Sequence, residues 1–156
     1  MPLDRELAEA PLALNLLRAQ EMPRLAWEAL ESGLDGPNLR RLAPPVRSTW
    51  FEVEELRAAA TKEMKIASIT VAEAAYRLAI RRTSEILDRR LDPLFYTREF
   101  ESLWIRAGCS DRLTVLGTLD DEAEIARFTG QTDAEIRKWL VRRLRESADS
   151  SSAKTT

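Results

Sequence analysis

The sequence contains no histidine and only one cysteine, Cys109. Histidine is the commonest general base near neutral pH and the commonest ligand for transition metals, so its absence excludes much of enzyme chemistry. Ser-His-Asp and Cys-His arrangements need histidine, as do the Glu-x-x-His sites of di-iron helical bundles. A single cysteine also excludes an intramolecular disulfide and a cysteine-based zinc cluster. We therefore expect no metal site.

Glycine is scarce as well, with five residues in the chain. The one close pair, Gly33 and Gly36, lies in the segment S-G-L-D-G-P, which is typical of a turn. Neither a Walker loop nor a G-x-G dinucleotide fingerprint is present. The sequence therefore predicts no nucleotide cofactor, and we expect no cofactor of another kind.

Long hydrophobic runs are missing too. The longest apolar run, residues 12–17, is interrupted by Asn15 and is far shorter than the roughly 18 residues that cross a membrane. The first residues, MPLDRELAEAP, carry acids and lack the apolar core of a secretory signal. We expect no membrane association, and the free cysteine favours a cytoplasmic location.

Hydrophobic residues make up 44% of the chain and charged residues 32%, which is enough for a folded core under a highly charged surface. Lys and Arg total 24 and Asp and Glu total 26, so the net charge is −2. This balance disfavours both a strongly basic nucleic-acid-binding protein and an acidic disordered one.

Proline divides the chain unevenly, because six of the seven prolines lie in the first 45 residues. This distribution predicts short, proline-broken helices over 1–43 and longer helices over 48–147. The Pro44-Pro45 pair is the one candidate internal boundary, but the residues before it are too few for an independent domain. We expect one domain over 1–147, followed by a disordered tail at 148–156, which has nothing to bury.

Apolar residues at helical spacing predict an all-α protein of about seven helices packed as antiparallel hairpins. Helices over 48–65, 71–90 and 93–107 are expected to form the central core. Ser48 is the expected N-cap of the first of these. One predicted buried stripe consists of Trp50, Val53, Leu56, Ala60 and Met64. Residues 66–71 and 113–117 are rich in β-formers, but neither has a hairpin partner.

Two groups of carboxylates are the remaining candidates for enzyme chemistry. They are Glu52 with Glu55, and the acidic run at 120–124. Acids are common at helix N-termini and on solvent-facing helix sides, and both groups lie in such places. Their presence therefore needs no catalytic role, and we expect a protein that is not an enzyme. Cys109 follows Gly108 at a helix end and is expected to be a half-buried structural thiol rather than a redox site.

Tryptophan occurs at 27, 50, 104 and 139, and most of these residues are expected in the core. Trp27 is the expected exception, because its short, proline-bounded helix leaves an apolar edge uncovered. Exposed tryptophan anchors protein partners. The composition is similar to that of small helical bacterial proteins that act as adaptors, inhibitors or immunity factors. Our leading hypothesis is therefore a non-catalytic protein that binds a protein partner, with Trp27 in the binding surface.

Residues 122–141 read E-A-E-I-A-R-F-T-G-Q-T-D-A-E-I-R-K-W-L-V. The spacing of Ala126, Gly130 and Ile136 resembles the helix-turn-helix motif of bacterial regulators, with Ile125 and Trp139 as flanking core residues. The resemblance implies that residues 132–144 form a recognition helix. The alternative hypothesis is thus a DNA-binding regulator that uses 122–145. Its candidate DNA-binding residues are Gln131, Thr132, Arg137, Lys138, Arg142 and Arg145.

Two features weigh against the DNA hypothesis. Asp133 and Glu135 at the start of the second helix repel phosphate. The later cations can equally be a solvated face that complements the helix C-terminus.

Overall fold

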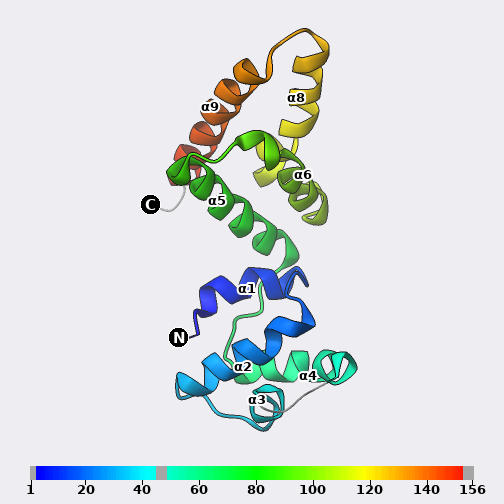
Figure 1. Ribbon diagram of the computed structural model, residues 1–156, viewed down its shortest axis with the longest axis vertical. Coiled ribbons are helices and arrows are strands. Elements are labelled where there is room, and N and C mark those ends of the chain that lie inside the picture. Colours follow the sequence, from blue (N-terminus) through cyan, green and yellow to red (C-terminus); the bar gives the residue numbers. More distant parts are fainter. Residues whose placement is uncertain (1–2, 45–48, 153–156) are drawn as a thin grey trace. The chain divides into compact units, whose positions relative to one another are not determined.

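The computed structural model describes residues 3–44 and 49–152, and within them every regular element is a helix, which confirms the all-α prediction. The chain divides into two compact units, Met1–Thr70 and Val71–Thr156 (Figure 1). The sequence favoured one domain with a composition change at Pro44-Pro45. That change falls inside the first unit, and Pro45 itself lies outside the described residues.

Short helices make up the first unit, and proline sets where two of them begin. Pro23 and Pro37 lie in the first turns of their helices, where the missing N–H leaves no hydrogen bond unmade. Gly33 ends the second helix with φ of +82°, a conformation that costs glycine little. The elements are α1 (Arg5–Ala13), the 3-10 helix η1 (Ala19–Glu21), α2 (Met22–Glu31), α3 (Pro37–Leu42) and α4 (Trp50–Glu63).

The core of the first unit is aliphatic. It is built from alanines and from larger side chains that include Met22, Leu39, Leu42, Val53, Leu56, Met64 and Ile66. The predicted stripe of α4 is confirmed except at Trp50, which is 68% exposed. Trp50 is the first residue of α4, so its side chain lies beyond the helices that cover the rest of the stripe. Thr49 caps this helix, and the predicted cap Ser48 lies outside the described residues.

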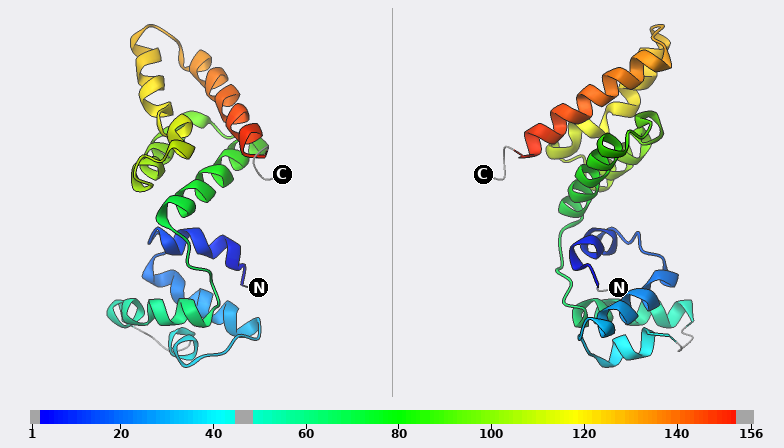
Figure 2. Two further views of the ribbon diagram at one scale, coloured as in Figure 1. Left: turned by 180° about the vertical axis from the view of Figure 1, so that it is seen from behind. Right: turned by 60° about the vertical axis from the view of Figure 1, so that its left-hand side comes forward.

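Longer helices dominate the second unit. It contains α5 (Val71–Arg89), η2 (Pro93–Phe95), α6 (Thr97–Arg106), η3 (Asp111–Leu113), α7 (Thr114–Gly117), α8 (Leu119–Phe128) and α9 (Asp133–Ser152). Figure 2 shows α8 and α9 running side by side in opposite directions in both views. The sequence predicted a disordered tail at 148–156; α9 continues as helix through 148–152, and 153–156 lie outside the described residues.

The second unit has its own core, and α8 and α9 are held in it by large apolar side chains. Phe100 of α6 is 1% exposed, and the α9 residues Ile136, Leu140 and Leu144 are fully buried. Gly117 lets the helices approach, because a Cβ on it would lie 2.3 Å from Cγ of Trp104. The sequence predicted one core shared by 48–65, 71–90 and 93–107. Instead, α4 buries its apolar face within the first unit.

Candidate binding surfaces

Two local features of the α8–α9 hairpin match what the helix-turn-helix resemblance implies. Gly130 takes the left-handed conformation, with φ of +93°, and Ile136 is fully buried. Thr132 and Glu135 form a capping box that starts α9: the Thr132 N–H donates to the Glu135 carboxylate at 2.8 Å, and the Glu135 N–H donates to Thr132 Oγ1 at 3.3 Å. The hairpin is therefore set by local sequence.

The end of α8 exposes large apolar side chains. Phe128 is 93% exposed and Ile125 is 63% exposed. The expectation that Ile125 lies in the core is therefore wrong, because the buried face of α8 runs through Leu119 and Ala123 instead. A crevice between α8 and α9 is lined by Glu122, Ile125, Ala126, Thr129, Gln131 and Trp139. The hairpin thus presents an uncovered apolar surface.

The predicted DNA-binding residues do not form one surface. Arg137 donates to both oxygens of Asp92 at 3.0 and 2.9 Å, which ties α9 to the start of η2. Thr132 is used in the capping box, and Gln131 lines the crevice. These three residues are therefore engaged within the unit or turned toward the crevice.

The other predicted cations, Lys138, Arg142 and Arg145, do share one face of α9. All three are exposed and line a shallow groove on the outside of the helix. Within the described part of the chain, none of their side chains has a hydrogen-bond or ion-pair partner. Neighbouring cations differ: Arg127 pairs with Asp133 at 3.0 Å, and Arg143 lies 3.7 Å from Glu122.

The acidic run at 120–124 is only partly a solvated face. Asp120 accepts a hydrogen bond from Thr97 Oγ1 and lies 3.6 Å from Arg98, so it fastens α8 to α6. Glu122 accepts from Thr118 Oγ1 at 2.8 Å. Asp121 and Glu124 are exposed and, among the described residues, have no side-chain partner. The outer face of α8 therefore carries two free acids.

Trp27 is 47% exposed on α2, as the sequence predicted. The sequence missed the other exposed aromatics of the first unit, Trp50 at 68% and Phe51 at 66%. Trp104 and Trp139 are half-buried. Exposure of Trp27 is necessary for a role in partner binding, and that role stays a prediction.

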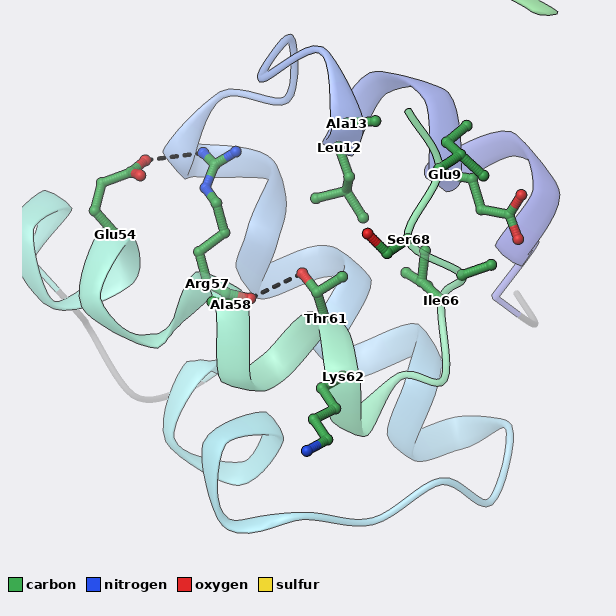
Figure 3. Close-up of a pocket in the computed structure, with 12 residues that line it drawn as sticks. Glu9, Leu12, Ala13, Glu54, Arg57, Ala58, Thr61, Lys62, Ile66 and Ser68 are labelled. Atoms are coloured by element: carbon green, nitrogen blue, oxygen red, sulfur yellow. Dashed lines mark hydrogen bonds and ion pairs between the residues drawn. The ribbon is translucent and has the colours of Figure 1, made fainter. Parts of the chain in front are cut away.

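The first unit also contains a pocket of about 480 Å³, which no pattern in the sequence predicts. It lies between α1, α4 and the segment after α4, and its lining is mostly apolar (Figure 3). Arg57 at its edge donates to Asn15 Oδ1 at 2.9 Å, to the Leu17 carbonyl at 2.9 Å and to Glu54 at 2.8 Å. This guanidinium holds the loop after α1, while the Nε of Arg57 is buried without a hydrogen-bond partner among the described residues.

The carboxylates considered for catalysis have structural roles or face solvent. Glu52 accepts from the Thr49 N–H at 2.7 Å, and this hydrogen bond, with a second from Thr49 Oγ1, lowers the pKa of Glu52 below its usual value. Glu55 is exposed, as expected. No group of three or more potential metal ligands occurs among the described residues.

Cys109 is exposed, so the expectation of a half-buried thiol is wrong. Gly108 and Cys109 both have positive φ, of 66° and 56°, in the turn that ends α6. This conformation directs the chain away from the helix and leaves the thiol in solvent.

Comparisons with protein-family models, with curated proteins and with solved structures find no match to this chain. None of the described helices is both long enough and apolar enough to cross a membrane.

Proposed function

We propose that this protein acts by binding another protein and that the α8–α9 hairpin is its principal contact surface. The observation that supports this most is the 93% exposure of Phe128, three residues after the 63% exposed Ile125 on α8. Residues at this spacing lie on the same side of a helix. Aromatic side chains contribute much of the energy of protein interfaces, and the adjoining crevice at Trp139 offers a place for a partner's side chain.

This proposed function has no catalytic residues, metal or cofactor. It includes Trp27 as a second candidate anchor, in the first unit. We also propose a cytoplasmic location, because an exposed free thiol such as Cys109 persists in a reducing compartment.

The test is to crosslink the protein in extracts of its host and compare variants by mass spectrometry. Phe128→Asp should abolish a specific crosslinked complex, since it places a charge at the centre of the apolar contact. Phe95→Asp is the matched control, because Phe95 is also highly exposed, at 81%, and lies outside the hairpin. A complex that survives Phe128→Asp, or that is equally lost in both variants, would contradict this assignment. Trp27→Ala examines the second anchor in the same way.

A DNA-binding regulator is the second candidate, favoured by the three unpartnered cations Lys138, Arg142 and Arg145 on α9. Against it, Arg137 is held by Asp92, and the free acids Asp121 and Glu124 lie on the neighbouring helix. If DNA binding were the function, affinity for duplex DNA would fall steeply with salt. Lys138→Ala with Arg142→Ala would then lower both the affinity and the salt dependence. We expect only weak, non-specific binding that ordinary salt removes.

A further inference from the structure

The outer face of the α8–α9 hairpin carries opposite charges on its two helices. On α8, Asp121 and Glu124 are exposed and are one helical turn apart. On α9, Lys138, Arg142 and Arg145 are exposed on consecutive turns. A crevice lined by Ile125 and Trp139, together with Glu122, Thr129 and Gln131, lies between the two helices. The surface therefore has an acidic edge, an apolar centre and a basic edge.

These charges differ from most others in the second unit because they lack partners. Arg82 pairs with Glu99 at 3.0 Å, Arg112 with Glu73 at 2.8 Å, and Arg137 with Asp92 at 2.9 Å. The five hairpin charges have no such side-chain partner within the described residues. These three ion pairs join different elements of the unit, whereas the five hairpin charges leave both signs available to another molecule.

We propose that the hairpin binds a second copy of this chain, with α8 of each copy lying against α9 of the other. In this dimer the two-fold axis runs parallel to the helices of the hairpin, within the interface. The rotation places α8 of one copy opposite α9 of the other, so the acidic edge of each copy meets the basic edge of its partner. Both contacts in such a dimer are equivalent. The inference rests on the proposed function and names the partner.

The same arrangement covers the apolar centre. In the dimer, Ile125 and Phe128 of each copy become buried against α9 of the other copy. There they pack against the methylene chains of Lys138 and Arg142. The net charge of −2 leaves little overall repulsion between two copies. An acidic helix of another protein would match only the basic edge and would leave Asp121 and Glu124 unpaired, whereas a second copy satisfies both edges.

Charge reversal with mixing tests the dimer directly. The purified chain should show a concentration-dependent dimer in analytical ultracentrifugation, and added salt should weaken this dimer. Asp121→Lys with Glu124→Lys, and separately Lys138→Glu with Arg142→Glu, should each raise the dimer dissociation constant by at least about 100-fold, because like charges then face each other. An equimolar mixture of the two variants should form a heterodimer with affinity close to that of the natural chain. In this heterodimer both contacts again join opposite charges.

The matched control is Arg81→Glu with Arg90→Glu, which reverses two exposed charges of the same unit outside the hairpin and should leave the dimer unchanged. Circular dichroism confirms that each variant keeps its helices. A natural chain that stays monomeric, a dimer that tolerates either hairpin reversal, or a mixture that fails to recover would each overturn the proposal. A monomeric chain that still loses a host complex on Phe128→Asp would overturn only the second-copy assignment and leave the proposed function standing.

Discussion

The two units place their aromatic residues in opposite ways. In the first unit the aromatic side chains are Trp27, Trp50 and Phe51, and all of them are exposed. In the second, Phe100 is buried, and Tyr76, Tyr96, Trp104 and Trp139 are half-buried. Only Phe95 and Phe128 of the second unit are exposed aromatics.

The core of the first unit is filled by aliphatic side chains and methionine, whereas Phe100 belongs to the core of the second unit. The first core contains Ala8, Ala26, Ala29, Ala43 and Ala60, all buried, and alanine lets short helices approach closely. The second unit has longer helices and accommodates rings, in one case by placing Gly117 under Trp104. Among the described residues, the second unit thus buries one aromatic ring and half-buries four, whereas the first unit buries none.

The largest expected effect is on the free energy of unfolding, and it compares one aromatic residue from each unit. Phe100→Ala removes a side chain that is 1% exposed, and should lower the free energy of unfolding of the second unit by about 3–5 kcal/mol. Trp50→Ala removes a larger ring that is 68% exposed, and should change stability by less than about 0.5 kcal/mol. Urea unfolding followed by circular dichroism measures both. Similar losses for the two variants would break the comparison.

A second, smaller effect concerns the carboxylate that joins α4 to α3 in the first unit. Glu63 accepts hydrogen bonds from the backbone N–H of Asn38 at 3.1 Å and of Leu39 at 2.9 Å, so it caps a neighbouring helix. Glu63→Ala leaves these donors without their acceptor and should destabilise the unit by about 1–2 kcal/mol in urea unfolding.

Glu55→Ala is the control for this prediction, since Glu55 lies on the same helix and is exposed. Asp92 has a comparable role in the second unit, because its carboxylate accepts a hydrogen bond from Arg137 and so joins η2 to α9. If Glu63→Ala and Glu55→Ala behave alike, the carboxylate does not hold the first unit together.

The smallest expected effect is at the start of α9. The hydrogen bonds from the Thr132 N–H and hydroxyl lower the pKa of Glu135. Thr132→Ala removes the hydroxyl, so the pKa of Glu135 should rise toward its ordinary value, as NMR titration of the carboxyl carbon can measure. Because the pKa of Glu135 is lower in the folded chain than in the unfolded chain, the ionised carboxylate stabilises the fold at pH values above the ordinary carboxyl pKa. This contribution to the free energy of unfolding is lost as the pH falls through the lowered pKa. An unchanged Glu135 pKa in Thr132→Ala would contradict the role of the hydroxyl.

Some local signals in the sequence were read correctly because their physics is local. Residues 3–43 form short helices, and Gly130 takes the left-handed conformation of the turn after α8, although Pro11 lies inside α1. The buried stripe of α4 follows from periodicity at Val53, Leu56, Ala60 and Met64. The exposure of Trp50 and Ile125 was missed, because spacing indicates which residues share a face but not where covering helices stop.

The amino-acid sequence by itself determined that the described chain is helical, and it excluded histidine chemistry and an intramolecular disulfide. Only the tertiary structure decided that α4 belongs to the first unit, that Arg137 is held by Asp92 and that Lys138, Arg142 and Arg145 stay free. Helix capping and periodicity act between residues a few positions apart. Ion pairing and burial depend on residues such as 92 and 137, which meet only when distant helices pack.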